Sequence, residues 1–346
     1  MEDGLCRTPM DKYLRLILTL LIACISSQLH AQHQSLSFAT NGQFKIVQFT
    51  DVHFQPGNPR SQVAIERMHE VLDAEKPNLV VYTGDLIFAA PAKEALLAVL
   101  APALQRQLPF AVVFGNHDDE FGLDRSELLE VTQGLPGNYT ATTAGLSGVT
   151  NFILPLQGAK EPGIQAVLYF FDSHAYSPLQ DVSGYDWLKR DQIQWYIQNS
   201  QAFTQLHQGS PLPSIAFFHI PLPEYAQAAS NENAKLVGSR MEKVCAPALN
   251  TGMFTAMLEA GDMMATFVGH DHNNNYAVLW HQILLCYGQF TGGDTVYNDL
   301  PEKNGARIII LEEGRRGFST YIRLKDGKII HPLQYPKSFQ KNIIPQ

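Results

Sequence analysis

Short runs of apolar residues recur along the chain, separated by polar stretches. Each run has the length of a β-strand and is rich in β-branched or aromatic residues, so each predicts a strand. The predicted strands cover residues 44–49, 79–83, 110–114, 166–171, 215–219, 265–268 and 283–287. Two more runs, 307–311 and 320–324, flank Gly314 and Gly317 and predict a hairpin that closes the fold.

Helical periodicity fills three of the gaps between these runs. Residues 61–75 place apolar side chains on one face of a predicted helix that begins at Ser61. An Ala- and Leu-rich helix is expected over residues 91–107, where Pro102 should kink or break it. A third helix is expected over residues 191–207.

The order of these elements bounds the fold class and the domain organisation. Alternating strands and helices predict an α/β fold with a largely parallel core, and the closing hairpin predicts a second or mixed sheet. Residues 135–161 lack clear periodicity and are expected to form loops around a short strand at 151–155. No repeat or linker-like tract divides the sequence. We therefore expect one domain over residues 44–330, with a short lead at 32–43 and a C-terminal tail at 331–346.

Composition narrows the class of protein. The chain has 346 residues, of which 45% are apolar and 17% charged, which excludes a disordered or low-complexity protein. The formal net charge of −8 argues against a protein that grips nucleic acid backbones, because these need Lys- and Arg-rich surfaces. A small phosphorylated substrate stays compatible with this charge, because a bound metal ion can reverse the charge locally.

The N-terminus has the layout of a secretory signal peptide. Lys12 and Arg15 precede the short apolar run 16–25, and small residues lead to a cleavage position after Ala31. We therefore expect export to the periplasm or the extracellular space. The alternative is a lipid anchor, because the residues that end in Cys24 resemble a bacterial lipobox. No other segment approaches transmembrane length.

Cleavage at that position would leave two cysteines, Cys245 and Cys286. Two thiols in a chain of this length do not make a disulfide scaffold, and their spacing matches no zinc motif. They form either a single disulfide or two buried thiols.

Potential metal ligands follow five of the predicted strands, at the point where each strand ends. In chain order the motifs are Asp51-x-His53, Gly84-Asp85, Gly115-Asn116-His117-Asp118, His219 and Gly269-His270-x-His272. In open α/β sheets, functional groups gather just beyond the carboxyl ends of the strands. The sequence therefore predicts that these side chains meet at one edge of the sheet.

The residue types at these strand ends suit divalent or trivalent metal ions. Carboxylate, imidazole and carboxamide ligands bind zinc, manganese and iron. In Asp-x-His and His-x-His on extended backbone, both side chains lie on the same side of the chain. A glycine before Asp85, Asn116 and His270 is expected to let the backbone bend there. The candidates are too many for one four-coordinate ion but suffice for two ions that share a bridging carboxylate.

The five motifs in this order resemble the calcineurin-like metallophosphoesterase superfamily, and their local context is similar to its purple-acid-phosphatase-like branch. The resemblance implies a four-layer α/β/β/α sandwich with two packed mixed β-sheets and a dimetal site at the C-terminal ends of the strands. It also implies the metal ligands. Asp51, His53 and His272 would hold one ion, Asn116, His219 and His270 the other, and Asp85 would bridge them.

One position departs from the purple acid phosphatases. They have a tyrosine three residues after the bridging aspartate, and this chain has Phe88 there. A phenyl ring cannot donate a phenolate to ferric iron, so the resemblance implies a general two-metal site without the purple iron chemistry. Phe88 also differs from the second aspartate that protein Ser/Thr phosphatases have at this position.

The resemblance implies hydrolysis of phosphate monoesters or diesters of small phosphorylated molecules. A hydroxide held between two ions, whether iron, manganese or zinc, would attack phosphorus, and His117 would donate a proton to the leaving oxygen. Asp118 is expected either to hold an imidazole ring in one tautomer or to be a surface residue in a turn. A non-catalytic, metal-dependent binder of phosphorylated ligands is the alternative function.

Groups near the motifs are less specific. Asp172-Ser173-His174 follows a predicted strand and would line the pocket or cap the next helix. Tyr225 and residues 273–275 would bind substrate or belong to ordinary loops. The aromatic cluster of Tyr185, Trp187, Trp195 and Tyr196 is expected to pack in the core.

Overall fold

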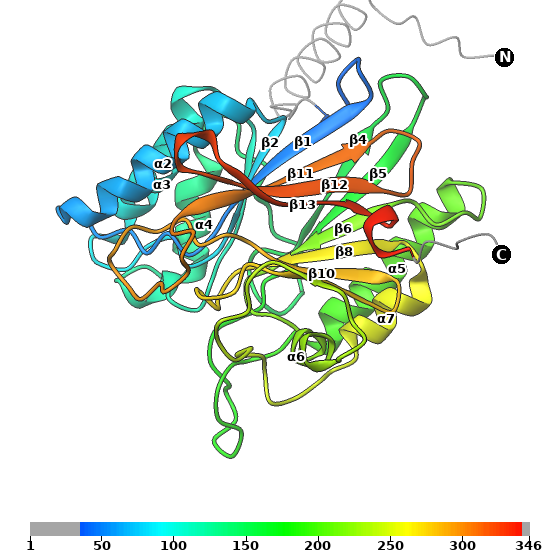
Figure 1. The fold of residues 1–346 in the computed structure, drawn as a ribbon. Helices are drawn as coiled ribbons and strands as arrows, with labels where there is room; N and C mark the ends of the chain where they lie inside the picture. Colours follow the sequence, from blue (N-terminus) through cyan, green and yellow to red (C-terminus); the bar gives the residue numbers. More distant parts are fainter. Residues whose placement is uncertain (1–34, 341–346) are drawn as a thin grey trace, which may run out of the picture. The chain divides into compact units, whose positions relative to one another are not determined.

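Two β-sheets packed face to face form the centre of the fold in the computed structural model, which describes residues 35–340 (Figure 1). The first sheet has six strands in the order β13-β12-β11-β1-β2-β3. In it β1, β2 and β3 run parallel, and the other neighbours are antiparallel. Its strands are β1 (Gln43–Phe49), β2 (Leu79–Thr83), β3 (Phe110–Val113), β11 (Gly305–Glu312), β12 (Phe318–Leu324) and β13 (Ile329–Tyr335).

The second sheet has seven strands in the order β4-β5-β6-β8-β10-β9-β7. Its central strands β5, β6, β8 and β10 run parallel, and antiparallel strands complete both edges. Its strands are β4 (Phe152–Gln157), β5 (Ile164–Phe170), β6 (Ser214–Phe217), β7 (Leu236–Val237), β8 (Met263–Val268), β9 (Ala277–Trp280) and β10 (Ile283–Tyr287).

Helices cover the outer face of each sheet and complete four layers (Figure 1). One group of helices packs on the first sheet: α2 (Pro59–Glu75), α3 (Ala92–Gln105) and α4 (Arg125–Gln133). The other group packs on the second sheet: α5 (Arg190–Leu206), α6 (Glu224–Ser230) and α7 (Met253–Ala260). The predicted α/β/β/α sandwich with two mixed sheets is therefore confirmed.

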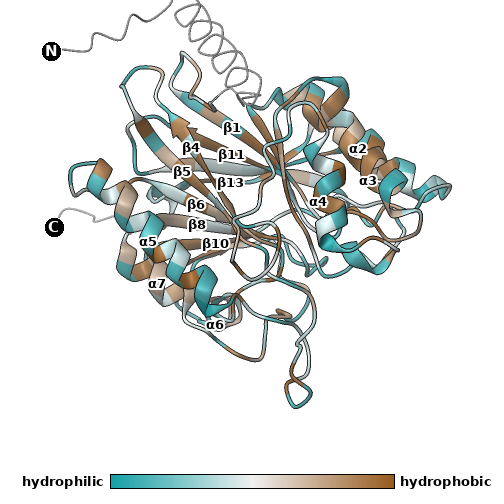
Figure 2. Cartoon of the chain, turned by 180° about the vertical axis from the view of Figure 1, so that it is seen from behind, coloured by the Kyte–Doolittle hydropathy of each residue, from teal (hydrophilic) through white to brown (hydrophobic). Residues whose placement is uncertain are grey.

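The central strands, such as β2 and β8, are continuous apolar runs because both of their faces are buried (Figure 2). In β2, Leu79 and Val81 pack between the two sheets, whereas Val80 and Tyr82 pack against the helices. In β5, Leu168 faces the other sheet and Tyr169 faces the helices. Three apolar layers thus fill the three spaces of the sandwich.

The predicted strands all form, and two of the three predicted helices differ in detail. The first helix begins two residues before Ser61, because Asn58 is its N-cap and accepts a hydrogen bond from the Arg60 amide at 3.0 Å. Pro102 does not break α3. It lies in the last turn, where little helix remains to be disrupted.

Some elements were not predicted, among them α4, α6, α7, β9 and β13. The domain also extends past its predicted limits at both ends. Leu36 and Phe38, in the predicted lead, pack between the sheets, and β13 continues to Tyr335 in the predicted tail. These ends are apolar and pair with strands of the sheet, so they belong to the domain.

Both cysteines of the domain are free thiols: Cys286 is buried and Cys245 half-buried. The prediction of two thiols therefore holds over the disulfide. Within residues 35–340, none of the helices is long and apolar enough to cross a bilayer. The predicted signal peptide and the alternative anchor at Cys24 lie outside the described residues.

Candidate metal centre

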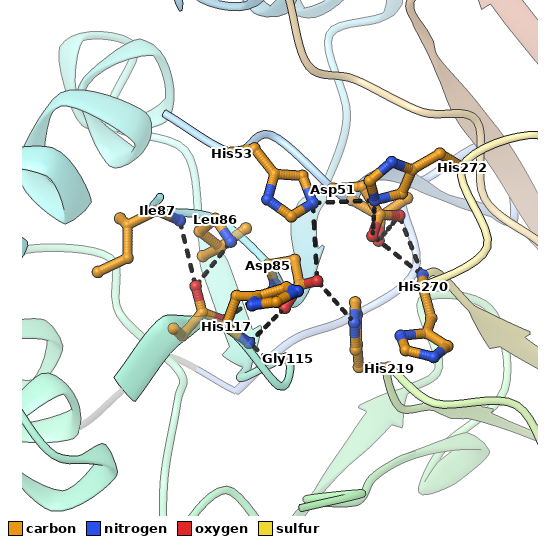
Figure 3. Close-up of polar contacts among 12 residues, drawn as sticks. Asp51, His53, Asp85, Leu86, Ile87, Gly115, His117, His219, His270 and His272 are labelled. Carbon is orange, nitrogen blue, oxygen red and sulfur yellow. Dashed lines mark hydrogen bonds and ion pairs between the residues drawn. The ribbon is translucent and has the colours of Figure 1, made fainter. Parts of the chain in front are cut away.

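The predicted ligands come from strand ends of both sheets. In the first sheet, β1, β2 and β3 are adjacent and parallel, so the residues that follow them lie side by side. Hydrogen bonds from the Asp51 amide to the Gly84 carbonyl and from the His53 amide to the Asp85 carbonyl, each 3.0 Å, continue this pairing beyond the strands. In the second sheet, adjacent β6 and β8 deliver His219 and His270. The labelled side chains of Asp51, His53, Asp85, His219, His270 and His272 lie close together in Figure 3.

The acidic and imidazole side chains form two groups that share one carboxylate. Asp51, His53, Asp85 and His272 make one group, and Asp85, His219 and His270 make the other. In each group one ligand atom from each residue lies within 4.8 Å of all the others. The Asp85 Oδ2 atom lies 3.2 Å from His219 Nε2 and 3.6 Å from His53 Nε2. This is the arrangement expected of two ion sites around a bridging aspartate.

Hydrogen bonds join the two sheets at this centre. His219, from the second sheet, donates from Nδ1 to the Thr83 carbonyl of the first at 2.7 Å. The His270 amide donates to the Asp51 carboxylate at 3.0 Å. Because these two bonds tie ligands of one sheet to the other sheet, the geometry of the centre depends on how the two sheets pack.

Two imidazoles are fixed in one tautomer by backbone carbonyls. The Nδ1 atom of His219 donates to Thr83, and that of His272 donates to the Tyr297 carbonyl at 2.9 Å. A carbonyl only accepts, so in neutral rings these bonds put the hydrogen on Nδ1 and leave the lone pair of Nε2 toward the centre. Metal-binding histidines are held in this way by their second nitrogen.

Buried polar atoms without a partner show that the residues fit metal ions. His270 Nε2 and the side-chain oxygen of Asn116 are buried and have no hydrogen-bond partner of good geometry. His53 Nε2 and His272 Nε2 lie only 3.0 Å apart. A buried unpaired polar atom is costly, and a bound cation would satisfy this set. Asn116 directly follows Gly115 beyond β3, next to the Asp85 loop.

Burial and mutual charge shift the pKa values of the predicted ligands in both directions. Burial lowers the pKa of His53 and of His270 well below the ordinary value, and lowers that of His272 to about 4. These rings are therefore neutral, which is the form that binds metals. Burial alone would raise the pKa of Asp85, but its neighbours His219 and His53 hold it well below its usual range. Burial raises the pKa of Asp51 to about 7, with a further contribution from Asp85.

The backbone of the ligands is strained. Asp51, His53, Asp85 and His270 all have positive φ, between 46° and 79°. Residues other than glycine rarely adopt this conformation, and it costs about 1–3 kcal/mol at each such position. Strain at four of the predicted ligands indicates that the surrounding structure fixes their side chains for function rather than for stability.

The glycines before the ligands act differently from the prediction. Only Gly84 has positive φ. A side chain at Gly115 would lie 2.1 Å from Asp85 Oδ1, and one at Gly269 would lie 1.9 Å from Thr50 Oγ1. Gly115 and Gly269 are therefore needed because other residues of the protein lie too close to leave room for a side chain. The left-handed backbone occurs mainly at the ligands themselves.

Asp118 holds backbone, not an imidazole ring. It is buried, and its carboxylate accepts hydrogen bonds from the amides of Asp85, Leu86, Ile87 and Gly115 at 2.7–3.2 Å. Both predicted roles, the ring holder and the surface turn, are therefore wrong. Asp118 ties the loop that carries Asp85 to the loop that carries Asn116.

Arg125, at the start of α4, holds the same loop from the other side. Its guanidinium donates to the Gly115 carbonyl at 2.6 Å and forms an ion pair with the buried Asp172 at 2.9 Å. Asp172 also accepts from the amides of Val149 and His174, so it caps no helix, contrary to the predicted cap. Sequence reasoning missed Arg125, because the contact joins residues far apart in the chain.

Replacing Arg125 with alanine (Arg125→Ala) is expected to destabilise the fold by about 3–5 kcal/mol at pH 7, because Asp172 would stay buried without its partner. Burial raises the pKa of Asp172, but Arg125 outweighs it and holds the pKa below its ordinary value. The ion pair therefore stabilises the fold fully above about pH 4. This stabilisation is lost as the pH falls through the pKa that Asp172 has in the folded protein. Urea unfolding at several pH values measures it.

The matched control is Arg315→Ala, which removes an exposed ion pair with Glu312. Exposed pairs contribute about 0–1 kcal/mol, so this variant should unfold nearly as wild type does. Equal losses in the two variants at pH 7, or a loss in Arg125→Ala that grows as the pH falls, would contradict the role given to Arg125.

His117, the predicted proton donor, lies at the rim of the centre. Its ring centre lies 5.7 Å from that of His53, and its side chain is 29% exposed. Nδ1 donates to the Glu120 carboxylate at 2.8 Å, which leaves Nε2 free. Glu120 was not predicted, although its spacing of three residues from His117 was visible in the sequence. Phe88 packs edge-on against both imidazoles, 5.0 Å from His53 and 5.2 Å from His117.

Among the other residues considered in the sequence, three have structural roles and one, Tyr185, contacts a predicted metal ligand. Tyr225 is buried and bonds to Thr266, and Asn274 and Asn275 accept from backbone amides, so the ordinary structural role holds for these three. Tyr185 was expected in the core. Its ring instead packs edge-on against His270, with ring centres 4.3 Å apart.

Comparison with known proteins places this geometry in context. The sequence model of the calcineurin-like phosphoesterase family matches residues 44–274. Among curated proteins, "Probable inactive purple acid phosphatase 29" of Arabidopsis thaliana is 31% identical over 91% of this chain and 90% of its own. "Phosphatase DCR2" of Saccharomyces cerevisiae is 34% identical over 74% of this chain, which spans about half (49%) of that protein.

Solved structures with the same fold include a dimetal phosphatase from Danio rerio. It superposes with a TM-score of 0.58 at 14% identity, over 84% of this chain and 98% of that one. GAP50 of Plasmodium, described as an anchor in the inner membrane complex, superposes with a TM-score of 0.55 at 12% identity over 84% of this chain and 88% of that one. At these identities the likeness concerns the fold alone.

Proposed function

Because the chain belongs to the calcineurin-like phosphoesterase family, we propose that it is a metal-dependent phosphohydrolase that cleaves small phosphate esters. One observation carries this proposal. Two buried ligand groups share Asp85, and His117 lies beside them at the rim with one ring nitrogen free. Metal ions and a proton donor side by side are what hydrolysis of a phosphate ester requires.

The residues fit two metal ions. Asp51, His53 and His272 would hold one, Asn116, His219 and His270 the other, and Asp85 would contact both. Two ions at such a site activate water as a nucleophile at neutral pH and neutralise the charge of the phosphoryl group. Iron, manganese and zinc all match the mixture of carboxylate, imidazole and amide ligands.

His117 supplies the proton for the leaving group. Its Nδ1 hydrogen is bonded to the Glu120 carboxylate, which orients the ring. Nε2 then holds the proton that passes to the leaving oxygen. An alkoxide is a poor leaving group, so this transfer is worth about 10²–10⁴-fold in rate.

A non-catalytic binder of phosphorylated ligands is the second candidate, because two plant relatives carry "inactive" in their names. Such a protein would need the metal ligands but no proton donor. His117 with its Glu120 partner supports hydrolysis over binding alone.

Hydrolysis of phenyl phosphate and bis(4-nitrophenyl) phosphate by the metal-loaded protein tests the proposal. Turnover of either ester, abolished by chelation and restored by metal, supports the phosphohydrolase. Tight binding of phosphate without turnover of either ester would favour the binder.

Iron-loaded protein is expected to be colourless in the visible range beyond weak absorption. The purple band of the purple acid phosphatases needs a tyrosinate ligand, and the corresponding position here is Phe88, whose ring packs against His53. An absorption spectrum of the ferric protein measures this. A strong tyrosinate-to-iron band would show that another phenol binds the metal.

We also propose export from the cytoplasm. The support is the basic, apolar and small-residue pattern of the first 31 residues. N-terminal sequencing of the protein from its native host should begin at Gln32. An N-terminal, lipid-modified Cys24 would support the alternative anchor, and an intact N-terminus would contradict both.

A further inference from the structure

The solvent side of His117 is lined by aromatic rings. Phe88 lies edge-on at 5.2 Å, and the ring of Tyr176 lies at 6.5 Å and 74° to the imidazole. Tyr176 stacks on Tyr185 at 5.7 Å and 24°, and Tyr185 in turn packs against His270. Tyr176 and Tyr185 together form what we call the tyrosine wall. It runs from the predicted proton donor to a predicted metal ligand.

The protein holds the tyrosine wall in place but leaves one ring uncovered. The two residues are bridge partners at the base of a hairpin, which is closed by hydrogen bonds from Ser177 to Gly184 and from Asp186 to Ala175 at 2.9 and 3.0 Å. The Tyr176 hydroxyl donates to Glu120 at 3.3 Å. Tyr176 is nevertheless 51% exposed. A large aromatic residue that is both ordered and exposed next to a reactive centre is available to a ligand.

We propose that the tyrosine wall is a leaving-group subsite that selects aryl phosphate esters, whose leaving group is a phenol. This inference rests on the proposed function, because it takes His117 as the group that faces the leaving oxygen. A leaving group that receives a proton from His117 must extend past that ring, and Tyr176 is the exposed ring beyond it. A flat aromatic group there can stack on Tyr176, whereas a small alkyl group cannot.

Charge narrows the class of leaving group further. The Glu120 carboxylate lies between His117 and Tyr176 and bonds to both. A leaving group with its own phosphates or carboxylates would meet this negative charge and be repelled. The subsite therefore favours uncharged phenols over nucleotides and other polyanionic esters.

The test separates binding from catalysis by using phosphonates, which are not hydrolysed. Benzylphosphonate mimics phenyl phosphate, and ethylphosphonate mimics methyl phosphate. Calorimetry on the metal-loaded protein should show that benzylphosphonate binds more tightly by roughly five- to tenfold, the value of one aromatic contact. Tyr176→Ala should remove this preference and leave the affinity for ethylphosphonate unchanged.

Two further variants control for the fold and for the hydroxyl. Tyr176→Phe keeps the ring and loses only the hydroxyl, which interacts with Glu120 and Asn116, so it should keep the preference. Leu179→Ala truncates another exposed apolar side chain, 50% exposed, in the same hairpin and should also keep it. Equal affinity for the two phosphonates in wild type, or a preference that survives Tyr176→Ala, would overturn the proposal.

Hydrolysis distinguishes a failure of the subsite from a failure of the proposed function. If phenyl phosphate is hydrolysed but Tyr176→Ala slows phenyl and methyl phosphate equally, the protein is a phosphohydrolase and the proposed subsite is wrong. If neither ester is hydrolysed but the preference for benzylphosphonate depends on Tyr176, the subsite is supported and the protein is a binder rather than a hydrolase. Phenyl phosphate and a phosphotyrosine peptide, compared side by side, show whether a small phenol ester or a protein side chain is the better source of the aryl group.

Discussion

Replacing Asp85 with asparagine (Asp85→Asn) should cost at least one of two metal ions and slow hydrolysis by about 10³-fold, equivalent to several kcal/mol. Asp85 is the residue that both ligand groups share. Its neighbours hold its pKa low, so it is present as a carboxylate, and an amide would bring neither the charge nor the second metal contact. Elemental analysis and the rate on phenyl phosphate measure the two effects.

Glu75→Gln is the matched control for Asp85→Asn. Glu75 is also a buried carboxylate, but it bonds to Lys45, Tyr321 and Arg323, away from the metal centre. This control should lose about 1.5–3 kcal/mol of stability, the value of a charge-assisted hydrogen bond, and still bind two ions. Full metal content and full activity in Asp85→Asn would show that Asp85 is not the bridging metal ligand.

The second large effect concerns His117. If His117 is the proton donor, His117→Ala should keep both metal ions and slow alkyl phosphates by about 10²–10⁴-fold. Aryl phosphates leave as weakly basic phenolates that need little help from a proton, so their loss should be clearly smaller. Comparing methyl phosphate with 4-nitrophenyl phosphate in wild type and variant, with metal content checked, measures this difference.

The other outcomes are distinct. Equal slowing of both esters would show that His117 only orients or neutralises the phosphoryl group, because that group is the same in each. A loss of stability with unchanged activity per folded molecule would make it a packing residue. Its side chain is 29% exposed, so a small effect on stability is expected.

The strands were predictable because this sandwich buries both faces of most of them. A strand buried on both faces is a continuous apolar run, as in residues 79–83 and 265–268, and such runs stand out in any sequence. Short elements such as β7 and α6 carry too few residues to show a period. The helix α4 was missed although the Asp124 and Glu127 capping box marks its start.

The ligand set was also predictable in part. Residues that follow adjacent parallel strands must meet at one edge, which brings Asp51, Asp85 and Asn116 together without further information. That the second sheet faces the first at this edge came from the family resemblance, because periodicity within a strand says nothing about how sheets pack. The strand-end argument also placed His219 and His270 at this edge, but in the same sheet, whereas they follow strands of the second sheet.

The supporting residues could not be read from the sequence. Arg125 and Asp172 are 47 residues apart, and Tyr185 contacts His270, which lies 85 residues (270 − 185) further along the chain. Such contacts depend on where the loops fold back onto the protein, and no periodicity in the sequence predicts this. Asp118 was predicted in the correct loop. Its bonds to four backbone amides could not be predicted, because they involve left-handed backbone at Asp85, which the residue type alone does not indicate.

Titrating metal-stripped protein with manganese or zinc, while following hydrolysis of phenyl phosphate, tests the dimetal phosphohydrolase most directly. Activity should be absent in the stripped protein and should rise to a plateau at about two ions per chain, because the ligand groups around Asp85 form two sites. Activity that persists without metal, or two bound ions with no hydrolysis of any phosphate ester, would contradict the assignment.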